Sequence, residues 1–201
     1  MKRGIFLLLL VTLIVGLAAC GDNAKEDGMN NQTNANQENT ESDNQDDEDQ
    51  TIDVDLENDD GESVGTVTLE EESDGVEVTL EGENLPKGMH AFHIHESGQC
   101  EAPDFDSAGD HYNPEDDNHG FDDSDGPHLG DMPNIAVGED GEVTQSFLVK
   151  DVTLDEDGDH SLLADGGTSL IIHEGADDGE SQPSGDAGDM IVCGPIVDDE
   201  E

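Results

Sequence analysis

The stretch Met89-His90-Ala91-Phe92-His93-Ile94-His95 combines a strand-forming pattern with residues that bind metals. Phe92 and Ile94 alternate with His93 and His95, and this two-residue period is typical of a half-buried β-strand. Both imidazoles are therefore expected on the same face of a strand over residues 89–95. A lone His-x-His pair also occurs on surface strands, so the pair alone does not establish a metal site.

Short runs of alternating apolar and polar residues continue on both sides of this stretch. Acid- and glycine-rich clusters, such as residues 58–61 and 73–75, separate the runs at hairpin spacing. The expected strands are residues 52–56, 64–69, 76–80, 89–95, 134–137, 142–149, 168–173 and 190–197. Because no segment keeps a helical period, the sequence predicts an all-β domain, an antiparallel sandwich or barrel.

A long segment without strand pattern, residues 96–133, interrupts these strands. Loops of this length inside a compact domain are usually functional. The segment contains His111, His119, His128 and Asp131, at intervals of eight, nine and three residues. Three imidazoles and a carboxylate suit a closed tetrahedral zinc site.

The N-terminal residues predict export and a flexible tether. Residues 1–20 have two basic residues, an apolar run too short to span a bilayer comfortably and a small-residue end, as in a signal peptide. Residues 17–20, Leu-Ala-Ala-Cys, resemble a bacterial lipobox, which predicts a lipidated Cys20 and an extracytoplasmic, membrane-anchored protein. An ordinary signal peptide stays the alternative. Residues 21–50 are too polar to fold and predict a disordered tether, which leaves one domain over residues 51–201.

The charge of the chain is extreme. All 54 acidic residues follow Cys20, and removal of Lys2 and Arg3 leaves three lysines, so the mature chain carries 3 minus 54, or −51. Such a surface repels nucleic acid and anionic lipid, which excludes both as expected partners. We expect a halophilic protein, because high salt screens the self-repulsion, and an acidic metal-binding surface is the alternative.

Six segments, taken together and in order, resemble the copper/zinc superoxide dismutases over residues 51 to about 197. They are Gly88–Glu96, Ala108–Pro114, His119-Gly120, His128–Asp131, Ser169–Glu174 and Cys193-Gly194. The resemblance implies an eight-stranded antiparallel Greek-key barrel or sandwich with long metal-binding and active-site loops. It also implies copper and zinc as cofactors and superoxide as the substrate, converted to dioxygen and hydrogen peroxide.

The resemblance assigns roles to particular residues. It implies that copper is bound by His93, His95, His111 and His173, and zinc by His111, His119, His128 and Asp131. His111 would bridge the metals and act as the catalytic proton carrier. Asp177 would link His93 to His119, His90 would brace the copper site through backbone hydrogen bonds, and Cys100 and Cys193 would form a disulfide.

One position departs from the family pattern. The family usually places an arginine three residues before the second cysteine, where it binds superoxide, and this chain has Met190 there. Residues 174–189 contain six acidic residues and no lysine or arginine, so the usual positive funnel is absent. A copper- and zinc-binding surface lipoprotein with little dismutase turnover is therefore the alternative function. The sequence leaves the oligomeric state open, with a homodimer as one option.

Overall fold

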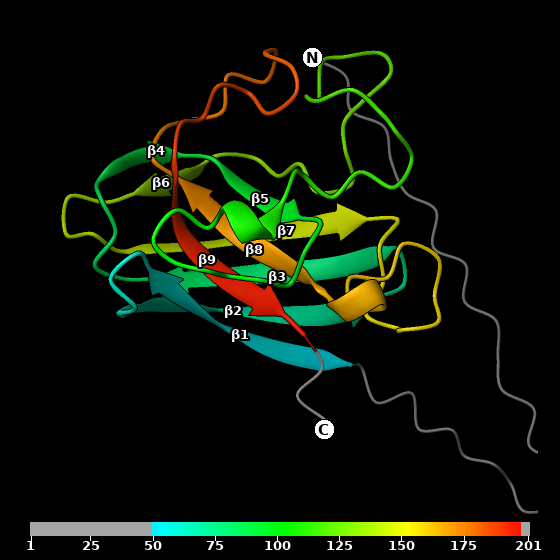
Figure 1. The fold of residues 1–201 in the computed structure, drawn as a ribbon, viewed down its shortest axis with the longest axis horizontal. Helices are drawn as coiled ribbons and strands as arrows, with labels where there is room; N and C mark the ends of the chain where they lie inside the picture. Colours follow the sequence, from blue (N-terminus) through cyan, green and yellow to red (C-terminus); the bar gives the residue numbers. More distant parts are fainter. Residues whose placement is uncertain (1–49, 198–201) are drawn as a thin grey trace, which may run out of the picture. The chain divides into compact units, whose positions relative to one another are not determined.

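The computed structural model describes residues 50–197, and these form a β-structure with almost no helix (Figure 1). The predicted signal peptide, Cys20 and nearly all of the predicted tether lie outside the described residues. The strands are β1 Thr51–Asn58, β2 Ser63–Glu72, β3 Gly75–Gly82, β4 Gly88–His90, β5 Phe92–His95, β6 Ile135–Val137, β7 Val143–Lys150, β8 Thr168–His173 and β9 Met190–Ile196. Two single-turn 3₁₀ helices, η1 Asp106–Ala108 and η2 Ala164–Gly166, interrupt the loops, and residues 50–197 contain no helix able to cross a membrane.

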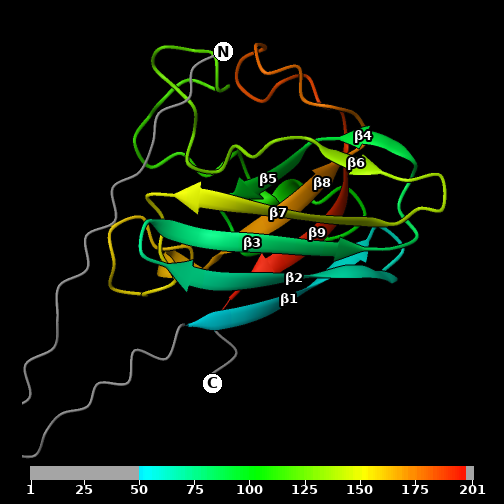
Figure 2. The same ribbon diagram turned by 180° about the vertical axis from the view of Figure 1, so that it is seen from behind.

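Seven of the strands form one curled antiparallel sheet in the order β5-β8-β9-β1-β2-β3-β7, and β4 pairs with β6 separately. The last strand, β9, lies beside the first, β1, through the pairs Glu57↔Cys193 and Asn58↔Val192. Figures 1 and 2 show the sheet curling so that its two ends face one another across the core. The all-β antiparallel prediction is confirmed.

The core follows from the alternation that predicted the strands. Val67 and Leu69 of β2 lie opposite Leu80 and Val78 of β3, and all four side chains are fully buried. Burying an aliphatic side chain of this size contributes about 1.5–3 kcal/mol, so these cross-strand pairs hold the meander of the first three strands together.

The predicted strand over residues 89–95 is wrong in one respect: it is divided at Ala91 into β4 and β5. The Ala91 N–H donates to the Gly175 carbonyl at 2.7 Å, and the Ala91 carbonyl accepts from the His173 N–H at 3.0 Å. These bonds join Ala91 to the end of β8 and the loop behind it, so β4 is free to pair with β6. The predicted eight strands are therefore nine.

Two long loops meet at one end of the curled sheet (Figures 1 and 2). They are residues 96–134, between β5 and β6, and residues 174–189, between β8 and β9. A disulfide between Cys100 and Cys193, with Cα atoms 5.7 Å apart, attaches the first loop to β9. This confirms the predicted disulfide and fixes the loop against the sheet.

Candidate metal centre

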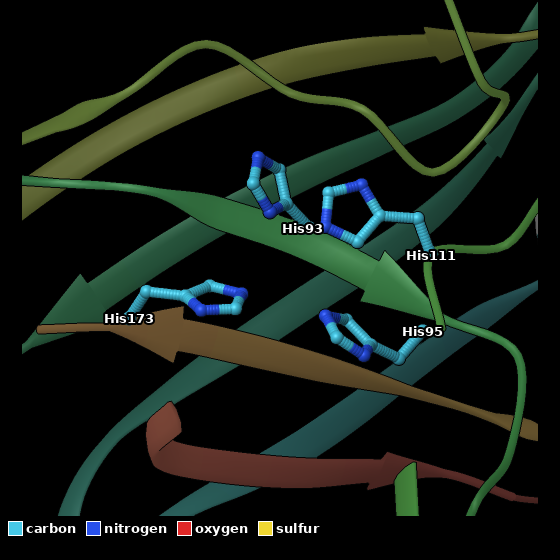
Figure 3. A group of neighbouring side chains, drawn as sticks. All are labelled: His93, His95, His111 and His173. Carbon is cyan, nitrogen blue, oxygen red and sulfur yellow. The ribbon is translucent and has the colours of Figure 1, made fainter. Parts of the chain in front are cut away.

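Four histidine rings converge beside β5, as Figure 3 shows. His93 and His95 project from one face of β5, while Phe92 and Ile94 project from the other into the core. His173 stands at the end of the neighbouring strand β8, and His111 reaches in from the long loop. An isolated backbone bridge between His95 and His111 holds the loop beside β5. The four rings are each at most 5 % exposed.

Each ring of this group keeps one nitrogen without a hydrogen-bond partner. The unpartnered atoms are His93 Nδ1, His95 Nε2, His111 Nε2 and His173 Nε2. One ligand atom from each of the four residues lies within 4.8 Å of the others. A buried polar atom without a hydrogen-bond partner costs free energy. Four such nitrogens in one place therefore indicate a site for a Lewis acid such as a metal ion.

The opposite nitrogens of two rings explain the orientation of those rings. His95 Nδ1 lies 2.8 Å from the Gly109 carbonyl, and His173 Nδ1 lies 3.2 Å from the Gly188 carbonyl. A carbonyl oxygen only accepts, so each Nδ1 is the N–H donor and each Nε2 carries the free lone pair. Burial lowers the pKa of His95 to about 3 and that of His173 to about 4, which keeps both lone pairs available at neutral pH.

A second group surrounds the Asp131 carboxylate. His111, His119 and His128 place their Nδ1 atoms 2.8, 3.1 and 3.3 Å from its oxygens. Backbone N–H groups of Gly120 and His128 also donate to Asp131 Oδ2, each at 3.1 Å. The edge of a tetrahedron with zinc–ligand distances of 2.0–2.1 Å is roughly 3.3 Å, so the spacing suits a zinc ion.

The charge of the second group also favours a cation. Burial alone would raise the pKa of Asp131, but hydrogen bonds from His111 and His119 outweigh it and hold that pKa well below its usual range. Burial alone would lower the pKa of His119, yet hydrogen bonds to Asp131 and Asp177 raise it to about 9. Positive charge is therefore stabilised between these carboxylates.

His111 belongs to both groups. Its Nδ1 faces Asp131, and its unpartnered Nε2 faces the first group, where its ring centroid lies 4.1 Å from that of His93. One imidazole thus offers a nitrogen to each of two adjoining sites.

Asp177 connects the same two groups from behind. Its Oδ2 lies 2.9 Å from His93 Nε2, and its Oδ1 lies 3.0 Å from His119 Nε2. Both rings donate to the carboxylate, which orients His93 Nδ1 and His119 Nδ1 toward their respective groups. His90, which lies outside both groups, places Nδ1 2.9 Å from the His173 carbonyl and Nε2 2.8 Å from the Pro86 carbonyl.

Three residues that the sequence did not single out position Asp177 and His119. The Asn134 side chain exchanges two 2.8 Å hydrogen bonds with the Asp177 backbone, and the Gln182 side chain does the same with the His119 backbone. Gly185 packs against the Asp177 carboxylate, where a side chain would collide with it. The Asn134 and Gln182 hydrogen bonds join residues 43 and 63 positions apart, and no local pattern signals them.

A pocket of about 750 Å³ opens onto the first group. His95, His111 and His173 lie at its floor, and Met190 forms part of its wall. Met190 lies opposite His173 across the β8–β9 pair, and its partly buried side chain packs against the cluster around Phe105 and Cys193. The pocket therefore connects three of the four histidines of the first group to solvent.

An antiparallel β-fold with two adjoining ligand groups that share one imidazole defines a dinuclear metalloprotein. The sequence profile of copper/zinc superoxide dismutase matches residues 63–196, and the chain belongs to this family. It is 46% identical over 144 residues to a Cu-Zn superoxide dismutase of Aquifex aeolicus, covering 71% of this chain and 85% of that one. It is 35% identical over 197 residues to a superoxide dismutase-like protein of Bacillus subtilis, covering 97% of both.

The fold agrees with this assignment. A crystal structure of a double mutant of a superoxide dismutase-like protein from Bacillus subtilis superposes with a TM-score of 0.70 at 40% identity. The match covers 73% of this chain and 97% of that one. Copper and zinc are the metals of the family, and the two groups offer the donors that fit them: four imidazole nitrogens for copper, and three imidazoles with one carboxylate for zinc.

Proposed function

We propose that this chain is a superoxide dismutase that converts superoxide to dioxygen and hydrogen peroxide. In this proposal His93, His95, His111 and His173 hold copper, and His111, His119, His128 and Asp131 hold zinc. The observation that carries it is the convergence of buried, unpartnered nitrogens into two groups that share His111.

Copper held by the four histidines of the first group would supply a one-electron redox change, and the overall reaction takes two superoxide anions and two protons to dioxygen and hydrogen peroxide. His111 holds and moves one of those protons at Nε2, its unpartnered nitrogen in the first group. Its Nδ1 stays oriented toward Asp131 at 2.8 Å. Asp177 keeps His93 and His119 in place during turnover because it accepts from both rings.

Metal content of two histidine variants tests the ligand assignment. His173 belongs to the first group only, so His173→Ala should lose copper and keep zinc. His111 belongs to both groups, so His111→Ala should weaken both metals. Elemental analysis of the purified proteins measures this, with circular dichroism as the control for folding. Equal loss of both metals from folded His173→Ala protein would contradict the assignment.

Turnover separates the proposed enzyme from its alternative. The fully loaded protein should accelerate superoxide decay catalytically, as measured by pulse radiolysis. One copper and one zinc per chain without catalytic decay would assign the alternative function, a metal-binding surface lipoprotein. Met190 and the acidic loop before it are the features that would permit that outcome.

The location of the protein forms a second part of the proposal: a lipid on Cys20 anchors it to the outer face of the cell membrane. The support is the signal-like sequence of residues 1–20 and its Leu-Ala-Ala-Cys end. The wild-type protein should partition into detergent, and Cys20→Ser should stay unprocessed or be released. Unchanged membrane association of Cys20→Ser would count against lipidation.

Adaptation to high salt is the third part. Lys87 and Lys150 are the two basic side chains other than histidine within residues 50–197, and Lys87 lies 3.8 Å from Glu139. Nearly all carboxylates of the described domain therefore lack a cationic side chain, and dissolved cations must screen them. The free energy of unfolding should rise with sodium chloride concentration, and a fall would contradict this.

A further inference from the structure

The mouth of the pocket above the first histidine group is strongly negative. Seven Asp and Glu residues line it, and no Lys or Arg does. Three of them flank the floor directly: Glu96 follows His95, Asp110 precedes His111, and Asp189 follows Gly188, whose carbonyl contacts His173 Nδ1. All three side chains are exposed, and no ion pair within residues 50–197 includes any of the seven carboxylates.

The floor of the same pocket holds histidine nitrogens whose lone pairs accept no hydrogen bond. His95 Nε2 and His173 Nε2 are buried, unpartnered and part of the group whose ligand atoms converge within 4.8 Å. His95 is 3 % exposed and His173 is 5 % exposed. A negative mouth above neutral nitrogen donors attracts a cation and then binds it, whereas it repels an anion such as superoxide.

We infer that the pocket mouth is an entry route for copper: its carboxylates steer the copper cation from solvent to the first histidine group. The inference rests on the proposed function, because it takes that group as the copper site. It adds a role for residues that the dismutase reaction does not use, the seven carboxylates of the mouth.

The donors along the route select copper over the alkaline-earth cations. Calcium and magnesium prefer oxygen ligands and gain little from a floor of imidazoles, whereas copper binds imidazole strongly. The Met190 thioether on the wall is a soft donor type that suits copper(I), and it adds no positive charge to the route. The mouth therefore concentrates cations by charge, and the floor retains the one that prefers nitrogen.

Loading kinetics test the inference with the full-length protein, first loaded with zinc and freed of copper. The probe is Cu²⁺, followed by the visible absorption that develops when copper binds several imidazoles. The mouth variant is Glu96→Gln, Asp110→Asn and Asp189→Asn together. A matched control removes three exposed carboxylates that lie outside the pocket, Glu70→Gln, Glu81→Gln and Glu142→Gln, so that both proteins lose the same net charge.

At low salt, the mouth variant should load copper about tenfold more slowly than wild type, within the range of electrostatic steering, and the control should stay within about twofold. The rates should converge near 1 M salt, where the screening length falls to about 3 Å. Equal loading by wild type and mouth variant at low salt would overturn the inference, as would equal slowing by the control.

The amplitude of the same experiment separates this inference from the proposed function. Wild type and both variants should each reach one copper per chain at equilibrium. If they do, and the rates are insensitive to the mouth charges, then only the entry route is refuted. If wild type fails to reach one copper per chain, both the route and the copper site are refuted.

Discussion

Replacement of Gly185 by alanine is expected to loosen both metals, although Gly185 is not itself a ligand. Gly185 has a φ of +73°, and a Cβ atom there would overlap the Asp177 carboxylate and lie 2.8 Å from His119 Nε2. The loop cannot easily retreat, because the Gly185 N–H donates to the Ser181 carbonyl and the Gly185 carbonyl accepts from the Asp178 N–H. The Asp177 carboxylate must therefore move away from His93 and His119.

The magnitude has two parts. A left-handed backbone costs a residue with a side chain about 1–2 kcal/mol, and this lowers the free energy of unfolding. Loss of a carboxylate that orients metal-binding histidines typically lowers metal affinity 10–100-fold, or about 1.4–2.7 kcal/mol. Because Asp177 contacts one ring of each group, copper and zinc affinity should both fall.

Gly61 provides the matched control. Its φ of +76° is nearly the same, and a Cβ atom there would meet nothing within 4 Å. In the metal-free proteins, urea unfolding should show the cost of backbone strain in both variants, with a larger loss for Gly185→Ala because its Cβ also displaces Asp177 from His93 and His119. In competition titrations with a coloured chelator, only Gly185→Ala should lose affinity for the metals. Gly185→Ala protein that binds both metals as tightly as Gly61→Ala would refute the role assigned to Asp177.

Three further predictions concern other parts of the molecule. Cys100→Ser with Cys193→Ser opens a loop with a sequence separation of 93 residues and should lower the free energy of unfolding by about 2–5 kcal/mol in chemical denaturation. The second-order rate constant for the reaction of the wild-type protein with superoxide should stay flat or rise with salt, and Met190→Arg should raise this constant at low salt. A steep fall of the wild-type constant with salt, with fold and metals unchanged, would show that the pocket attracts superoxide. Glu71 accepts two hydrogen bonds from the loop after β7, so Glu71→Ala should lower the free energy of unfolding by about 1–3 kcal/mol while Glu72→Ala leaves it nearly unchanged.

The strands could be predicted because their information is local. The two-residue alternation that places Val76, Val78 and Leu80 in the core is visible along the chain and appears unchanged in β3. The division at Ala91 was not predictable in this way. It depends on hydrogen bonds to Gly175 and His173, which lie more than eighty residues further along the chain.

The candidate site also has residues that the sequence could predict and residues that it could not. Motif order placed the seven ligand residues in two groups that share His111, and the structure brings those side chains together. The residues that hold the loops in place could not be predicted from the sequence. Asn134 and Gln182 bind backbone groups of distant residues, and every residue has such groups, so no side-chain motif marks the partner. Gly185 has a role only because the Asp177 carboxylate occupies the space beside it.

Asp131 and Asp177 show how structure separates two carboxylates from the other 52 acidic residues of the chain. Their side chains are 1 % and 9 % exposed. Asp131 accepts hydrogen bonds from the His111 ring and two backbone N–H groups, and Asp177 accepts from two histidine rings and one backbone N–H. Burial would raise the pKa of each, but these donors outweigh it and keep both pKa values well below their usual range. Charge is therefore retained where it orients imidazoles, because donors replace the lost water. The remaining carboxylates that face solvent are hydrated and need no such hydrogen-bond donors. Their negative charge therefore does not disturb the core or the histidine groups, and it acts instead on the ions that approach the protein.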